Sequence, residues 1–140
     1  TIREIYRTRA AILELVASDV ARNASENELQ ELAGVVDEMA RAHSNNDLRA
    51  YIWAIIAFHD LNLAVSKNMT AKRIVESLLL RTLRQRRASL SRTGRMAASL
   101  DDHQRLITAY KDRDANLAAA LIRSNHFNAL RNIELSASEH

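Results

Sequence analysis

The sequence predicts an all-α fold, a single bundle of about six helices. The 140 residues include no proline and only two glycines, Gly34 and Gly94, whereas β-sandwiches and barrels use many turn residues of both types. Apolar residues recur three and four positions apart, which is the period of a helix with one buried face. No apolar run approaches the roughly 20 residues of a membrane span. We therefore expect one compact soluble domain covering residues 1–140.

Helix starts follow from capping residues. Ser25 and Glu28 have the spacing of a capping box, in which each side chain accepts a hydrogen bond from the other residue's amide. Further starts are predicted at Asn46-Asp47, at Thr70, and at Ser99 or Asp101. The predicted helices cover residues 2–22, 26–43, 47–66, 70–90, 100–111 and 114–134. Residues 88–98 form the longest expected irregular segment.

Each of the first four predicted helices carries an apolar stripe that justifies its place in the bundle. The third, from 47 to 66, is apolar over most of its circumference, so we predict that it is central and that Phe58 and His59 are buried. The stripes of the other three contain Ile5, Ile12 and Val16; Leu29, Leu32, Val36 and Met39; and Ile74, Leu78, Leu79 and Leu83.

Several polar residues interrupt these stripes. Arg9 lies between Ile5 and Ile12 on the first helix, and a guanidinium that faces a core must find an anion or a set of acceptors, a structural ion pair, or a path to the surface. On the later helices the inward polar residues are His59, His103 and Asn125, with His126 one position beyond. Each histidine is either a hydrogen-bonded core residue or, with a partner from another helix, a metal ligand.

Other functional classes are disfavoured. The chain has no cysteine, which excludes disulfides, thiol nucleophiles and cysteine-based zinc sites. Two glycines cannot form a glycine-rich phosphate loop. Six arginines between residues 77 and 100, with no acid among them, are interpreted as a solvated helix face and loop or a subunit contact, because a groove-reading motif is absent. They are Arg81, Arg84, Arg86, Arg87, Arg92 and Arg95.

Two functional alternatives remain from the residues alone. His59-Asp60 is an HD dipeptide, which supplies metal ligands in some helical phosphohydrolases, with His43 or His103 as a further ligand. Adjacent residues on a helix diverge by about 100°, so the pair is weak evidence for this enzyme. In the other alternative the chain is a structural or adaptor bundle whose inward polar residues are merely satisfied in the core.

Four short segments, in order, carry a family resemblance. Residues 5–12, IYRTRAAI, resemble the family's first helix with its recurrent arginine at Arg9. Residues 50–59, AYIWAIIAFH, followed by Asn68, resemble its D-x-x-F-H…N stretch. Residues 92–103 match G-R…S-L-x-E-H, and residues 109–125 follow A…R-D-A…M-R-x-H. The chain thus resembles the C-terminal effector-binding and dimerisation (FCD) domain of GntR-superfamily, FadR-subgroup transcription regulators.

The resemblance implies a helical ligand-sensing domain with a central ligand pocket, not an enzyme. A small carboxylate effector would bind there at Arg9, His59, His103 and Asn125. Many members also hold a divalent metal through one aspartate and three histidines. Here His59 and His103 match two ligands, while Ile55 and Asn125 occupy the aspartate and third histidine positions. Zinc or nickel is thus an optional cofactor. Without metal, the four pocket residues are expected to act as hydrogen-bond donors.

The resemblance also implies partners. We expect a homodimer of a cytoplasmic bacterial regulator, with the arginine-rich fourth helix and the first helix as contact surfaces, and no membrane association. The family reads DNA through an N-terminal winged helix, which nothing in this chain resembles. Since the chain also lacks an initial Met, we expect it to be a piece of a longer protein that binds DNA through that missing domain.

Overall fold

The computed structural model describes residues 1–138, and these residues form helices and short connections without a strand. The all-α prediction is therefore confirmed. There are seven described α-helices and one 3-10 helix: α1 (Ile2–Asn23), α2 (Glu26–Ser44), α3 (Leu48–Ser66), α4 (Met69–Leu79), η1 (Leu80–Thr82), α5 (Leu83–Leu90), α6 (Arg95–Lys111) and α7 (Ala115–Ser138).

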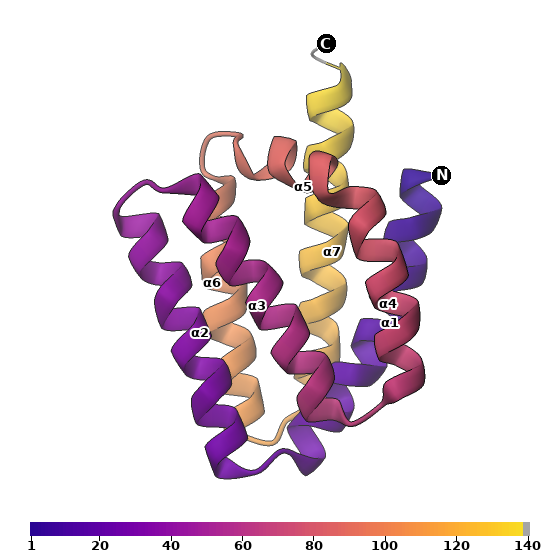
Figure 1. Cartoon of the computed structure of the whole chain (residues 1–140), viewed down its shortest axis with the longest axis vertical. Helices are drawn as coiled ribbons and strands as arrows, with labels where there is room; N and C mark the ends of the chain where they lie inside the picture. The colour runs from indigo at the N-terminus through magenta and orange to yellow at the C-terminus, as the bar shows by residue number, and fades with distance from the viewer. Residues whose placement is uncertain (139–140) are drawn as a thin grey trace.

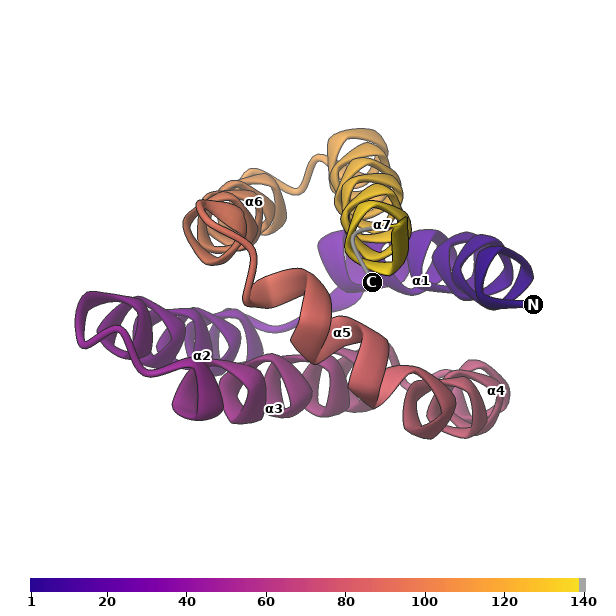
Figure 2. The ribbon, with the colours of Figure 1, turned by 90° about the horizontal axis from the view of Figure 1, so that it is seen from above.

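Six helices form a ring, and the seventh crosses one end of it. Around the ring α1 packs on α7, α7 on α6, α6 on α2, α2 on α3, α3 on α4, and α4 on α1. The short α5 runs across the upper end in Figure 1 and between the two rows of helices in Figure 2. It therefore lies over the space that the ring encloses.

Two predicted helix starts are confirmed, at Ser25 and at Asn46-Asp47, whereas α4 is capped by Asn68, two residues before the predicted start at Thr70. Ser25 accepts a hydrogen bond from the Glu28 amide and Glu28 accepts one from the Ser25 amide, which completes the predicted capping box at α2. Asp47 and Asn68 cap α3 and α4 in the same way, each accepting from the amide three residues later. These local bonds satisfy amides that have no partner within the helix.

The segment from residue 70 to 100 differs from the prediction. The expected helix 70–90 is interrupted at η1, so that α4 and α5 run in different directions. The expected irregular segment 88–98 shrinks to residues 91–94, and α6 begins at Arg95 rather than near residue 100. Gly94 makes this early start possible, because its φ of 80° is a left-handed conformation that glycine adopts at little cost.

The third helix lies in the middle of one row of helices rather than at the centre of the ring. Phe58 and His59 are buried as predicted, but Trp53 on the opposite side is 62% exposed. Among the described helices, α3 alone is long and apolar enough to cross a membrane, by length and composition only. That is weak evidence for a span, since a core helix of a folded domain meets the same criteria.

Candidate functional site

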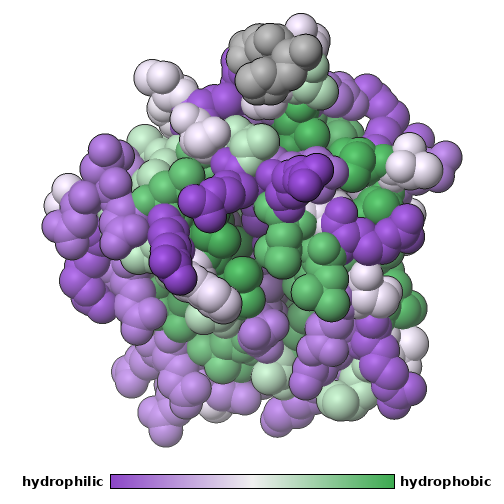
Figure 3. All heavy atoms as spheres, turned by 45° about the horizontal axis from the view of Figure 1, so that its top comes forward, coloured by the Kyte–Doolittle hydropathy of each residue, from purple (hydrophilic) through white to green (hydrophobic). Residues whose placement is uncertain are grey.

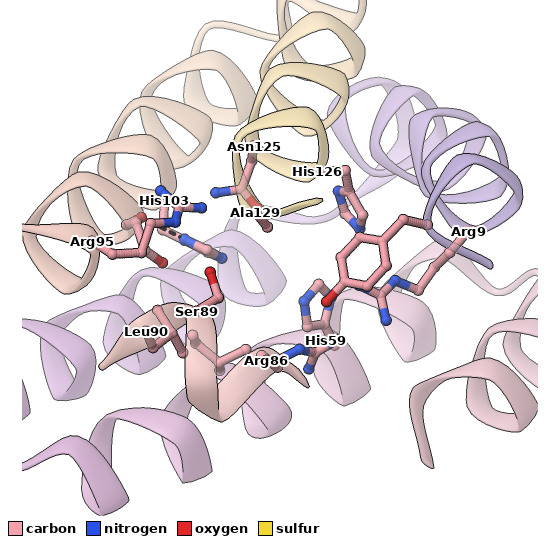
Figure 4. Close-up of a pocket in the computed structure, with 13 residues that line it drawn as sticks. Arg9, His59, Arg86, Ser89, Leu90, Arg95, His103, Asn125, His126 and Ala129 are labelled. Atoms are coloured by element: carbon pink, nitrogen blue, oxygen red, sulfur yellow. Dashed lines mark hydrogen bonds between the residues drawn. The ribbon is translucent and has the colours of Figure 1, made fainter. Parts of the chain in front are cut away.

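A cavity lies inside the ring, beneath α5. It is a small cavity of about 40 Å³ between side chains of α1, α3, α5, α6 and α7. Ile55 and Leu90 bound it on the side of the main apolar core, while Tyr6 and Ala129 belong to a smaller apolar cluster between α1 and α7. Figure 4 shows the polar side chains that enter this space.

All four of the predicted site residues line this one cavity. Arg9 comes from α1, His59 from α3, His103 from α6 and Asn125 from α7. Four helices that are far apart in the sequence thus place one cation, two imidazoles and one amide around the same space. Their function as ligand contacts stays a prediction.

Arg9 is buried without an acidic partner among the described residues. Its side chain is 2% exposed, and Nη1 donates to the hydroxyl of Thr82 at 2.9 Å. The guanidinium carbon lies 4.2 Å from the centre of the Tyr6 ring, a cation–π contact. Its Nε has no hydrogen-bond partner. Burial lowers the pKa of Arg9, and the neighbouring Tyr6 opposes part of that effect.

Two more arginines line the cavity, and the sequence interpretation of them as solvated was wrong. Arg86 of α5 is 7% exposed and Arg95 of α6 is 6% exposed. Nη1 of Arg86 and Nε of Arg95 lack hydrogen-bond partners. Burial, and then the charge of Arg9, lower the pKa of Arg86 to about 10. The break at η1 carries Arg86 over the cavity, which a single straight helix does not predict.

The orientations of two histidines are fixed by backbone carbonyls. His103 Nδ1 lies 2.7 Å from the carbonyl of Ser99, and His126 Nδ1 lies 2.9 Å from the carbonyl of Ile122. A carbonyl only accepts, so each Nδ1 carries a proton, and Nε2 of the neutral ring is an acceptor. Burial lowers the pKa of both rings, that of His126 to about 3. The expectation that neutral His103 donates to an anion therefore needs a correction, because its single N–H already binds Ser99.

His59 lies near His126, with the centres of the two rings 6.5 Å apart. It is buried, and its Nδ1 has no hydrogen-bond partner among the described residues. Burial first, and then the charge of Arg86, hold the pKa of His59 well below its usual value. The three cavity histidines are therefore uncharged at neutral pH. His126, set aside in the sequence because it falls one position late, lines the cavity together with Asn125.

Acidic groups are scarce around the cavity. The described residues that line it include no aspartate or glutamate. Behind the wall, half-buried Asp102 accepts a hydrogen bond from the Asn125 amide at 2.9 Å, and its charge also favours the charged form of Arg95. Six cavity-lining polar groups have an atom without a partner: Tyr6, Arg9, His59, Arg86, Ser89 and Arg95. This set consists mainly of donors, which suits an anion.

The residues present do not fit a divalent cation. Ile55, at the position of the expected aspartate, places an aliphatic side chain against the cavity, and Asn125 binds Asp102. Among residues 1–138 no three histidine, cysteine, aspartate or glutamate side chains are grouped so that they could share an ion. Hard cations prefer carboxylate ligands, and the guanidiniums of Arg9 and Arg86 would repel any cation here.

The two residues of the HD dipeptide, His59 and Asp60, do not face the same space. His59 faces the cavity, whereas Asp60 is exposed and does not line it. His43 lies half-buried near the end of α2, also outside the cavity wall. These side chains therefore do not assemble the converging ligands that a metal-dependent hydrolase needs.

Comparison with known proteins gives one match. The family model for the FCD domain matches residues 4–129, which include all the residues that line the cavity. No curated protein matches the chain.

Proposed function

The chain belongs to the FCD domain family, the C-terminal effector-binding domains of GntR-family regulators, and from this premise we propose that its cavity binds a small carboxylate effector. One observation carries the proposal: buried cations and unsatisfied donors converge on a cavity whose described lining residues include no acid. A buried charge without a partner is costly. A carboxylate would supply the missing acceptors.

Arg9 is the first residue to test. Its planar guanidinium forms two parallel hydrogen bonds with a carboxylate, and Nε is free to make one of them. Removing such a charge-assisted bond weakens binding by roughly ten- to a hundredfold. His59 and Asn125 are the other proposed donors, whereas His103 contributes only a wall contact, because its single N–H binds the carbonyl of Ser99.

The experiment is a calorimetric screen of small mono- and dicarboxylates against the wild-type chain, Arg9→Ala and His103→Ala. Arg22→Ala is the matched control, because Arg22 is an exposed arginine at the other end of α1. We expect Arg9→Ala to weaken every hit and Arg22→Ala to weaken none. Equal binding by wild type and Arg9→Ala would remove Arg9 from the site, and the absence of any hit would refute a carboxylate effector.

We further propose that the domain acts as a homodimer in a bacterial cytoplasmic regulator. On the α4–α5 side, Leu80 is 77% exposed and Ile74 and Leu83 are also exposed. Figure 3 views the crossed end of the bundle and shows apolar side chains among hydrophilic ones at the surface. A second copy would cover such residues. We expect sedimentation to give a dimer at micromolar concentration and Leu80→Glu to shift it toward monomer; a monomeric wild type would contradict this.

The regulator role implies a DNA-binding domain encoded upstream of this segment. A winged helix of about 70 residues there would establish it. We expect the domain itself to show no phosphoesterase turnover, since Asp60 lies outside the cavity wall. Metal-dependent turnover abolished by both His59→Ala and Asp60→Ala would contradict that expectation.

A further inference from the structure

We propose that the effector is a compact dicarboxylate held directly by Arg9, Arg86 and Arg95, without a metal ion between ligand and protein. The inference rests on the proposed function and deepens it: it assigns the ligand's charge and two additional contact residues.

The number of charges expected on the ligand follows from the charged groups that line the cavity or lie next to it. Arg9, Arg86 and Arg95 each contribute a positive charge, and Asp102, close to Arg95, contributes one negative charge. The three histidines are neutral. Two positive charges are therefore left without compensation, and a ligand with two negative charges would balance them. A monocarboxylate would leave one guanidinium in a low-dielectric space without a counter-charge.

The distribution of the cations indicates two separated anionic groups. Arg9 and Arg86 enter on the side of His59, and both of their charges act on that ring. Arg95 enters on the opposite side of the cavity in Figure 4, beside His103, and the pKa of that ring is lowered by the charge of Arg95 together with that of Arg86. A carboxylate at each end would reach both groups of donors, whereas one phosphate ion would occupy only one end.

Unused hydrogen-bond donors occur at both ends. Nε of Arg9 and Nη1 of Arg86 are free on one side, and Nε of Arg95 is free on the other. The hydroxyl of Ser89, also unpaired, lies between them on α5. Each arginine is more than nine-tenths buried, so water in bulk does not satisfy these atoms. The wall thus offers a donor to each end of an elongated anion.

The arginines that line the cavity also explain why it does not suit a metal cation. Where other family members are expected to place an aspartate, this chain has Ile55, and α5 adds a positively charged guanidinium in place of a cation's charge. The arginines therefore supply the positive charge that a metal would otherwise present to the ligand's carboxylates.

The test is calorimetry with three pairs of probes of equal carbon number, in which the diacid has a second carboxylate in place of the monoacid's methyl group: malonate and propionate, succinate and butyrate, glutarate and pentanoate. Inorganic phosphate serves as the dianion with a single centre. Every titration is run with EDTA and again with zinc. We expect at least one diacid to bind roughly tenfold or more tightly than its monoacid. Its affinity should not change with EDTA, and phosphate should bind more weakly.

Two variants test the additional residues. Arg86→Met and Arg95→Met keep the aliphatic volume and remove the charge, and we expect each to reduce diacid affinity to that of the monoacid. Arg87→Met, an exposed neighbour on α5, is the control and should bind as wild type does. Arg86→Lys should restore part of the affinity. Thermal melting without ligand should show that Arg86→Met is at least as stable as wild type, because it removes the repulsion with Arg9.

The outcomes separate the two proposals. If monoacids bind as well as diacids, if phosphate binds as tightly as the best diacid, or if EDTA abolishes binding and zinc restores it, the dicarboxylate inference is overturned while an effector site remains. Unchanged diacid binding by Arg86→Met and Arg95→Met overturns it as well. If no carboxylate of either class binds, the proposed function and this inference are both refuted.

Discussion

At the scale of residues, the buried imidazole of His126 makes the fold sensitive to acid. Burial and the charge of Arg9 hold its pKa at about 3 in the folded chain, against about 6.5 in an unfolded one. Between these values the unfolded state binds a proton that the folded state does not. The free energy of unfolding therefore falls as the pH falls below 6.5, by about 1.4 kcal/mol per pH unit for this residue.

Urea unfolding at pH 7 and pH 5 measures this effect. We expect wild type to lose about 2 kcal/mol more than His126→Gln over that interval, since glutamine does not titrate. The carboxylates that also titrate are shared by both proteins and cancel in the difference. Equal losses would show that the imidazole accepts a proton in the folded state.

At the scale of elements, the two glycines are expected to respond oppositely to the same substitution. Gly34 lies inside α2 with ordinary helical geometry and open space around its Cα, so Gly34→Ala should stabilise the chain by up to about 1 kcal/mol. Gly94 also has open space, but its φ of 80° is strained for alanine. Gly94→Ala should therefore destabilise by about 1 kcal/mol.

Thermal or urea unfolding of the two variants tests the pair. Gly94→Asn is a further control, because asparagine tolerates the left-handed conformation better than alanine and should cost less. If Gly94→Ala proved neutral, the positive φ would not be what fixes the start of α6.

The same elements explain what the sequence could and could not predict. Arg9 was identifiable because it interrupts a regular apolar stripe on a long helix. Arg86 and Arg95 were not identifiable, because the segment with the six arginines has no regular apolar stripe that would show which of them face inward. The inward side of α5 depends on its direction across the ring, and the break at η1 that sets this direction has no glycine or proline to mark it. His126 was left out of the predicted site because the match of residues 122–125 to the family pattern places Asn125 at the histidine position, whereas the cavity reaches both of these adjacent residues of α7.

At the scale of the whole molecule, the cavity is lined by five of the seven described α-helices. A ligand there touches α1, α3, α5, α6 and α7 at once, so its binding energy adds to the stability of the entire domain. At a ligand concentration a hundred times the Kd, the expected gain is about 2.7 kcal/mol. For a domain of this size that raises the Tm by roughly 5–10 °C.

Differential scanning calorimetry with and without the best diacid checks this expectation, and Arg86→Met should remove most of the shift. A ligand that bound in calorimetry but left the Tm unchanged would have to occupy the surface, or bind the unfolded chain equally well.

The crossing helix has a consequence for how this domain could diversify. Residues 83–90 supply Arg86 and Ser89 to the cavity, while the six ring helices hold the bundle together. Changes in ligand preference can therefore accumulate in eight residues with little disturbance to the scaffold. Exchanging that short segment between related proteins would transfer part of the ligand preference from one to the other. A library of variants confined to it would be a small starting point for building sensors of new metabolites.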